Sequence, residues 1–195
     1  MRIALTGKMR SGKDTVANLI KSKHPEYTTL AFSDGIKKVI QICFPEELEK
    51  GTKPREFYQR IGQGLRKLNR HVWVNYVDRE LQALPDPTNV IVTDCRQLNE
   101  NKYLRDNGFI VVKVEADKDE RLHRIKEAGE EITEEQFNHS TELEVDLIEP
   151  DYIIRNIGSI KKLDGEVDRL YEFYDNYFKP YQNYIKLLKE RSFTQ

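Results

Sequence analysis

A glycine-rich loop follows the first apolar run of the sequence. Residues 2–6 read RIALT and residues 7–15 read GKMRSGKDT, so glycines stand at positions 7 and 12 and a lysine at position 13. Glycine adopts backbone angles that turn successive amide N–H groups toward one point, and a helix opening after Gly12 adds the partial positive charge of its N-terminus. The apolar run before the loop reads as a strand, which is the context that such an anion site requires. The sequence therefore predicts a phosphate-binding loop.

Short apolar runs rich in β-branched residues recur along the chain. They read RIALT, YTTLAF, NVIVTD, FIVVKVEA and DYIIRN, and segments of helical period separate them. Continuous apolar runs are typical of parallel strands that are covered on both faces. We therefore expect an α/β fold of the P-loop type, with three layers and a five-stranded parallel sheet.

The length of 195 residues favours a single domain over residues 1–195. Between the second and third strands, apolar residues recur at helical spacing in two blocks, which predicts a helical insertion at about 45–85 that breaks at Asn69–Arg70. An acidic segment after the fourth strand predicts a lid at about 117–145. Aromatic residues crowd the segment at about 160–191, where we expect Pro180 to separate two helices. These helices either pack against the sheet edge and each other or form a partner interface, such as a homodimer.

The overall charge points away from large anionic partners. Charged residues make up 33% of the chain, yet the net charge is −1. We therefore expect no nucleic-acid polymer and no membrane as partner, and an anion site must be a local cluster of cations. Cys43 and Cys95 form no Cys-x-x-Cys pair, and no apolar run approaches the ~20 residues of a membrane span. A cytoplasmic protein fits these features.

The end of the glycine-rich loop is unusual, because Asp14 stands where a hydroxyl residue normally follows the lysine. A bare carboxylate would repel a polyphosphate, so we expect Mg²⁺ between Asp14 and the phosphates of ATP, with the Thr15 hydroxyl nearby. Alternatively, Asp14 turns away and favours the start of the helix. Lys13 would reach the terminal phosphates. The predicted donor residues of the loop are Gly7, Lys8, Arg10, Ser11, Gly12, Lys13, Asp14 and Thr15.

Two segments supply candidates for a second ligand opposite the loop. Asp34 and Lys37 follow the second strand, at the edge where such sheets bind ligands, although Ser33 or Asp34 could simply cap a helix. In the insertion, one helical stripe combines guanidiniums that can fork a phosphate, an amide that can read a base edge and a glycine that lets a ring approach. A solvated helix face is the alternative. The stripe consists of Arg55, Gln59, Gly62 and Arg66.

The third strand ends in TDCRQLNE. At that strand tip, Asp94 can hold magnesium or position the attacking oxygen, and Arg96 can bind a phosphate. We expect Asn99 and Glu100 to cap and anchor the next helix.

The fourth strand leads to a pair of arginines one helical turn apart, Arg121 and Arg124. In phosphoryl transfer such arginines neutralise charge on the moving group, so we count them with Lys13 and Asp94 as candidate catalytic residues. The segment Asn138–Glu142 belongs to the expected lid, and its His139 is a weak candidate.

The string GKMRSGKDT resembles the phosphate-binding loop of the deoxynucleoside monophosphate kinases of bacteriophages and some bacteria. Animal-type phosphomevalonate kinases share its Gly-Lys-Asp ending. Further segments are similar to the deoxynucleoside monophosphate kinase family from residue 1 to about 170, whereas Gln63–Gly64 departs from its pattern. The similar segments contain Asp34 and Lys37; Arg55, Gln59, Gly62 and Trp73; Asp94, Arg96 and Glu100; His139, Thr141 and Glu142; and Asn156, Gly158 and Ser159.

The resemblance implies transfer of the terminal phosphoryl group of ATP to a small-molecule nucleotide, a nucleoside or deoxynucleoside monophosphate. It also implies that Asn156 and Gly158 flank the donor adenine, while Ser159 can cap the helix that follows. Two alternatives stay open: a kinase for another small molecule, such as phosphomevalonate, and a nucleotide-binding switch without transfer. The guanine-reading Asn-Lys-x-Asp pattern is absent, because NKYL at residues 101–104 ends in leucine.

Overall fold

The computed structural model describes residues 1–49, 55–129 and 143–192. Its centre is a five-stranded sheet in the order β2-β3-β1-β4-β5, and each pair of neighbouring strands is parallel. The expected five-stranded parallel sheet is thus confirmed. The strands are β1 (Arg2–Thr6), β2 (Thr28–Leu30), β3 (Val90–Cys95), β4 (Ile110–Glu115) and β5 (Tyr152–Arg155).

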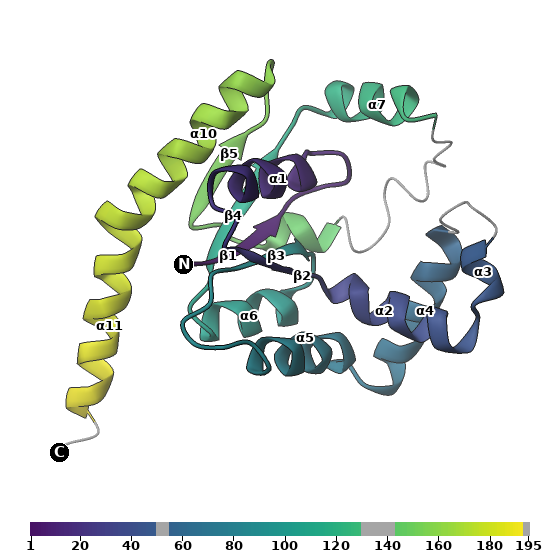
Figure 1. Cartoon of the computed structure of the whole chain (residues 1–195), viewed down its shortest axis with the longest axis horizontal. Helices are drawn as coiled ribbons and strands as arrows, with labels where there is room; N and C mark the ends of the chain where they lie inside the picture. The colour runs from purple at the N-terminus through teal and green to yellow at the C-terminus, as the bar shows by residue number, and fades with distance from the viewer. Residues whose placement is uncertain (50–54, 130–142, 193–195) are drawn as a thin grey trace.

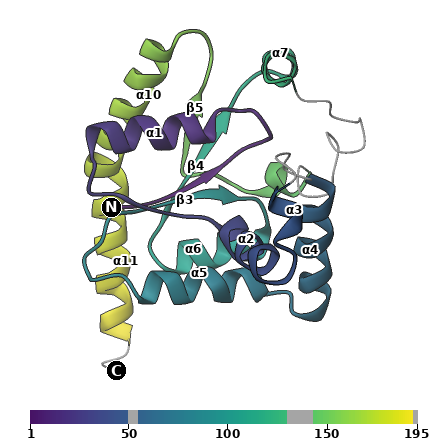
Figure 2. The same cartoon turned by 45° about the vertical axis from the view of Figure 1, so that its right-hand side comes forward.

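Helices cover both faces of the sheet, which gives three layers. In Figures 1 and 2, α1 and α10 lie on one side of the strands, and α5 and α6 lie on the other. The helical segments are α1 (Lys13–Lys23), α2 (Phe32–Cys43), α3 (Glu46–Glu49), α4 (Arg55–Leu68), α5 (Val72–Gln82), α6 (Leu98–Asp106), α7 (Lys118–Glu127), the 3₁₀ turn η1 (Val145–Leu147), α10 (Ile160–Phe173), the π-helical η2 (Tyr174–Phe178) and α11 (Lys179–Ser192).

Two apolar cores follow from the alternation of side chains along the strands. On β1, Ile3 and Leu5 belong to the core formed with α1 and α10, whereas Ala4 belongs to the core formed with α2, α5 and α6. Successive residues of a strand point to opposite faces, so an uninterrupted apolar run fills both cores. The sheet thereby holds the carboxyl ends of its strands, and the loops after them, on a rigid base.

Helix α2 begins at Phe32, the last residue of the apolar run YTTLAF that predicts the second strand, and the strand itself ends at Leu30. The reason lies on β3. The carboxylate of Asp94 accepts the backbone N–H groups of Phe32 at 2.8 Å and of Ser33 at 2.9 Å. These are N–H groups that a helix start cannot satisfy by itself, and the negative charge also suits a helix N-terminus. The alternative in which Ser33 or Asp34 caps the helix is therefore wrong, because the cap comes from another strand.

The insertion contains the two predicted helices, α4 and α5, with the break at the predicted place. The indole Nε1 of Trp73 on α5 donates to the carbonyl oxygen of Gly62 on α4 at 3.1 Å. A Cβ atom on Gly62 would lie 3.0 Å from Cδ1 of Ile36 on α2. The expectation that Gly62 leaves room for a ligand ring is corrected, because Ile36 fills that space.

The C-terminal helices differ from the prediction at Pro180. The chain does not turn there; instead α10, η2 and α11 follow one another as a continuous helical rod (Figure 1). Pro180 has no N–H to donate to the carbonyl four residues earlier. The π-helical η2, which ends just before Pro180, accommodates this missing hydrogen bond within the rod. Figures 1 and 2 show α11 extending past the sheet, and several of its apolar side chains are exposed, among them Tyr181, Tyr184 and Leu187.

Candidate active site

The glycine-rich loop between β1 and α1 requires glycine at both of its predicted positions. Gly7 has φ +141°, and a Cβ atom there would lie 2.4 Å from the carbonyl oxygen of Val114. Gly12 has φ +100°, and a Cβ atom there would lie 2.1 Å from Nδ2 of Asn156. Arg10 between them also has a positive φ of 60°. Such angles turn backbone amides toward a common point, so the loop has the conformation of an anion nest.

Lys13 is held at this loop by its ammonium group. Nζ donates to the carbonyl oxygens of Gly7 at 2.7 Å and Lys8 at 3.0 Å, and the residue is only 8% exposed. A cation therefore lies against the backbone that forms the nest.

Asp14 and Thr15 are both exposed in the first turn of α1. Among residues 1–49, 55–129 and 143–192, no group of three or more His, Cys, Asp and Glu side chains could hold a metal ion by itself. Mg²⁺ prefers oxygen ligands and is usually held by one or two carboxylates together with substrate phosphates. The carboxylate and hydroxyl oxygens at the start of α1 fit that pattern.

Two arginines of α7 contact the back of the loop. Nη1 of Arg121, which is 6% exposed, lies 3.4 Å from the carbonyl oxygen of Met9. Arg124 donates to the carbonyl oxygens of Arg10 at 3.2 Å, Ser11 at 3.4 Å and Asn156 at 3.4 Å. The structure thus brings both predicted arginines to the loop.

Asn156 supports the same loop from the end of β5. Its side-chain Nδ2 donates to the carbonyl oxygen of Ser11 at 2.8 Å, and the residue is buried. Gly158, two residues later, has φ +86°. Ser159 caps α10 as expected, because its side chain accepts the N–H of Lys162. The side chain of Asn156 thus contacts the phosphate-binding loop, and the expectation that Asn156 and Gly158 flank the adenine stays a prediction.

Arg66 and the backbone of Arg96 meet at one buried carboxylate. Glu100 accepts the N–H of Arg96 at 2.9 Å with Oε2, and its Oε1 lies 2.9 Å from Nη2 of Arg66. Glu100 also completes a capping box with Gln97 at the start of α6, and Asn99 donates to the carbonyl oxygen of Arg70, as the expected cap and anchor. Burial raises the pKa of Glu100 to about 7. The charge of Arg66 and the hydrogen bond from the backbone of Arg96 act in the opposite direction and lower this pKa. The guanidinium of Arg66, a residue of α4, therefore lies near the end of β3.

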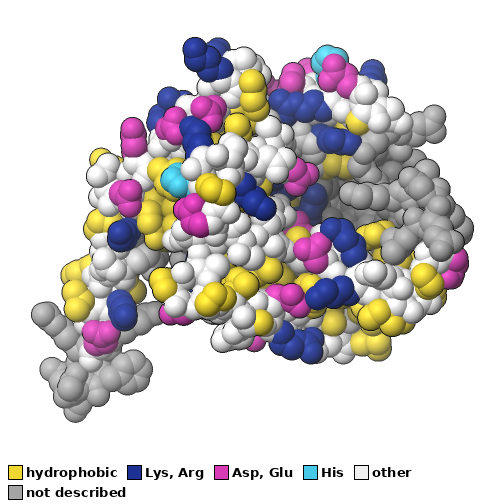
Figure 3. Space-filling view, in the orientation of Figure 1, with side chains coloured by type: hydrophobic (Ala, Val, Ile, Leu, Met, Phe, Trp, Pro, Cys, Tyr) yellow, Lys and Arg dark blue, Asp and Glu magenta, His cyan; other side chains and the backbone are white. Residues whose placement is uncertain are grey.

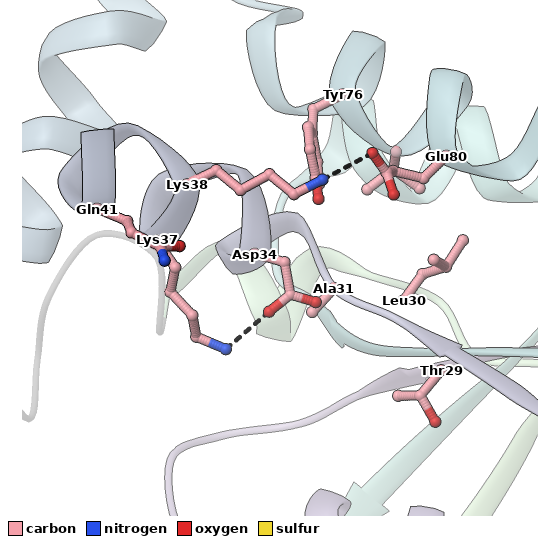
Figure 4. A pocket seen from close by; sticks show the side chains of 10 residues that line it. Thr29, Leu30, Ala31, Asp34, Lys37, Lys38, Gln41, Tyr76 and Glu80 are labelled. Atoms are coloured by element: carbon pink, nitrogen blue, oxygen red, sulfur yellow. Dashed lines mark hydrogen bonds and ion pairs between the residues drawn. The ribbon is translucent and has the colours of Figure 1, made fainter. Parts of the chain in front are cut away.

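Asp34 and Lys37 line a cavity of about 340 Å³ between β2, α2 and α5 (Figure 4). Their side chains form an ion pair of 2.7 Å. The ion pair raises the pKa of Lys37, to which Asp94 also contributes. Across the cavity, Lys38 pairs with Glu80 at 3.0 Å and stands 4.9 Å from the ring centre of Tyr76 (Figure 4).

A second cavity, of about 290 Å³, adjoins the phosphate-binding loop at the ends of β4 and β5. Lys8 pairs with Asp146 beside it at 2.8 Å. The hydroxyl of Ser11 is buried at this cavity and has no hydrogen-bond partner within the described part of the chain. The charged residues that line the cavity are Lys8, Lys113, Glu115, Asp117, Arg121, Asp146 and Arg155.

The surface around these elements carries charges of both signs. Figure 3 shows Lys and Arg side chains beside a hollow on this face of the molecule, with Asp and Glu side chains among them.

Some predicted residues are not placed, and others were missed. His139 and the rest of Asn138–Glu142 lie outside the described residues, as does the side chain of Arg55. Gln59 is partly buried on α4. Sequence reasoning missed Lys38 and Asp146, because a lysine beside Lys37 and an aspartate in an acidic segment carry no distinctive signal.

Comparisons with known proteins agree with this fold. A family described as an AAA domain matches residues 3–145. The chain belongs to this AAA domain family. No curated protein matches its sequence.

Several solved structures, kinases among them, share the architecture of this AAA domain protein. A shikimate kinase from Acinetobacter baumannii in complex with shikimate has a TM-score of 0.57 and 19% identity, over 90% of this chain and 94% of that one. A gluconokinase from Sinorhizobium meliloti 1021 has a TM-score of 0.55 and 14% identity, over 90% and 97%. The protein TT1252 from Thermus thermophilus has a TM-score of 0.54 and 20% identity, over 88% and 96%. The fold is thus the α/β fold of P-loop kinases.

Within the described residues, no helix combines the length and the apolar character needed to cross a bilayer.

Proposed function

We propose that this AAA domain protein transfers the terminal phosphoryl group of ATP to a nucleoside or deoxynucleoside monophosphate. The observation that carries the proposal is the position of Arg66. Its guanidinium is held at the end of β3, on a different element from the loop that would bind the donor. A guanidinium in that position suits an acceptor that already carries a phosphate.

The donor residues follow from the loop. The amides of residues 8–15 and the ammonium of Lys13 would bind the phosphates of ATP. The unpaired Ser11 hydroxyl can bond the donor as well. Asn156 contacts the loop at Ser11, and the resemblance implies that Asn156 and Gly158 flank the adenine.

Magnesium would be held by Asp14, Thr15 and the phosphates, with Asp94 contributing through water. Each oxygen of Asp94 has further lone pairs beyond its bond to α2. When bound, the ion neutralises charge on the phosphates.

The reaction needs no protein nucleophile. A phosphate oxygen of the acceptor forms a bond to the terminal phosphorus, the bond from that phosphorus to the bridging oxygen breaks, and ADP leaves. Positioning and neutralisation of charge contribute most of the catalysis in such transfers. Arg121 and Arg124 would neutralise charge on the donor. The acceptor would lie near Asp34, Lys37, Arg55, Gln59, Arg66 and Arg96.

Incubation of the purified protein with ATP, Mg²⁺ and a panel of acceptors tests the proposal. The panel holds the ribonucleoside and deoxynucleoside monophosphates, together with shikimate, gluconate and phosphomevalonate. We expect a nucleoside diphosphate from at least one monophosphate. Transfer to one of the other three compounds alone, or slow hydrolysis of ATP with no phosphorylated product, contradicts the nucleotide acceptor.

A further inference from the structure

The two carboxylate oxygens of Glu100 have separate partners. Oε2 accepts the backbone N–H groups of Arg96 at 2.9 Å and Gln97 at 3.1 Å, which precede α6. Oε1 accepts from Nη2 of Arg66 on α4. Capping of α6 therefore uses one oxygen, and the bond to the guanidinium uses the other.

Arg66 depends on this carboxylate for its position. Its side chain is 17% exposed and that of Glu100 is 2% exposed. Within the described part of the chain, Glu100 is the hydrogen-bond partner of the Arg66 guanidinium. A mostly covered cation is costly without a partner, so Glu100 keeps Arg66 in its place. A guanidinium has five N–H donors, so Arg66 has donors beyond the one that Glu100 accepts.

We infer that Glu100 is a positioning residue, which holds Arg66 in the orientation that binds the phosphate of the acceptor. The inference rests on the proposed function. A long side chain that is already ordered loses less conformational freedom when it binds a ligand. The negative charge of Glu100 also repels a phosphate. Without Glu100, however, Arg66 would turn toward water, because a buried guanidinium without a partner is unfavourable. For binding of the acceptor phosphate, the gain from an oriented Arg66 therefore exceeds the repulsion by Glu100.

The substitution Glu100→Gln separates the two tasks of this side chain. Its amide oxygen can still accept the N–H groups of Arg96 and Gln97, but its NH₂ group then faces Arg66 and cannot accept from it. At pH 8, we expect the KM for the nucleoside monophosphate to rise about ten-fold, as for the loss of a charged hydrogen bond, with the KM for ATP unchanged. Arg66→Met should raise the KM for the same acceptor at least as much. In the double variant, Glu100→Gln should add less than about two-fold, because the two residues act as a unit.

Tyr103→Phe on the same helix is the matched control. The Tyr103 hydroxyl donates to Asp78 on α5 at 3.0 Å, so its loss weakens a contact between α6 and a neighbouring helix without touching Arg66. We expect both KM values to stay as in the wild type, even where the melting temperature falls.

The outcomes distinguish the inference from the function on which it rests. A wild type that phosphorylates no nucleoside monophosphate overturns the proposed function and this inference with it. An active wild type whose Glu100→Gln variant keeps its acceptor KM overturns the inference alone. The inference is also overturned if Glu100→Gln raises the KM for the acceptor and the KM for ATP equally. The same holds if its effect on the acceptor KM is fully additive with that of Arg66→Met.

Discussion

The side-chain Nδ2 of Asn156 lies 2.8 Å from the carbonyl oxygen of Ser11, 145 residues away in sequence. A Cβ atom added at Gly12 would lie only 2.1 Å from the same nitrogen. The end of β5 therefore supports the phosphate-binding loop from below, and the loop leaves no room for a side chain at Gly12.

Gly12→Ala should destabilise the protein by about 1–3 kcal/mol, because alanine is strained at φ +100° and collides with Asn156. Urea denaturation followed by circular dichroism measures the change in unfolding free energy. Gly165→Ala is the matched control. Gly165 lies inside α10, and apart from its chain neighbours and the adjacent backbone of its own helix no atom lies within 4 Å of the new Cβ, so alanine there should stabilise by about 0.5–1 kcal/mol. Equal effects at the two positions would refute the packing argument.

Lys13→Met should lower kcat/KM for ATP by about 10²–10³-fold, as expected when a cation that stabilises the transition state is removed. Steady-state kinetics with the best acceptor of the panel measures it. Lys21→Met, an exposed lysine on the same helix, should leave kcat/KM within about two-fold. Full activity of Lys13→Met would remove the loop from the mechanism.

Asp94→Ala should destabilise the protein by about 1–3 kcal/mol, because the N–H groups of Phe32 and Ser33 lose their acceptor. Asp94→Asn keeps one acceptor oxygen and should lose less. Denaturation midpoints of the two variants test this order. An alanine variant as stable as the wild type would show that Asp94 does not hold the start of α2.

The contribution of Glu100 to the free energy of unfolding should fall as the pH rises from about 4.5 to about 7. The pKa of Glu100 is raised from its ordinary 4.5 to about 7 by burial, so over this range the folded protein holds a proton that the unfolded chain has released. Bound protons then favour the folded state, and that stabilisation is lost as the pH passes 7. For this one group the change is on the order of 3 kcal/mol. Unfolding free energies of wild type and Glu100→Gln at several pH values check it, because the difference between them should change with pH. A constant difference would contradict the raised pKa.

Local patterns in the sequence explain why much of the fold was predictable. The five strands are short apolar runs, and the loop at Gly7 and Gly12 lies within nine consecutive residues, so neighbouring residues suffice to indicate both. The break between α4 and α5 and the cap at Ser159 are local in the same way. The structure confirms the parallel sheet and the position of the loop that these local patterns predict.

Contacts between distant elements were not predictable. Helix α2 begins early because Asp94, 62 residues further on, accepts the N–H group of Phe32. No periodicity within residues 27–35 could indicate that. The space expected for a ligand ring at Gly62 is likewise filled by Ile36, because α2 meets α4 of the insertion there.

The order of residues alone thus determined the class of fold and the place of a phosphate-binding loop, since both depend on the spacing of glycines and apolar side chains within short segments. Tertiary structure alone decided which polar groups meet: Asp94 with α2, Glu100 with Arg66, and Asn156 with Ser11. The physical reason is that a buried polar group needs a partner, and the packing of the sheet and its helices selects that partner from anywhere in the chain.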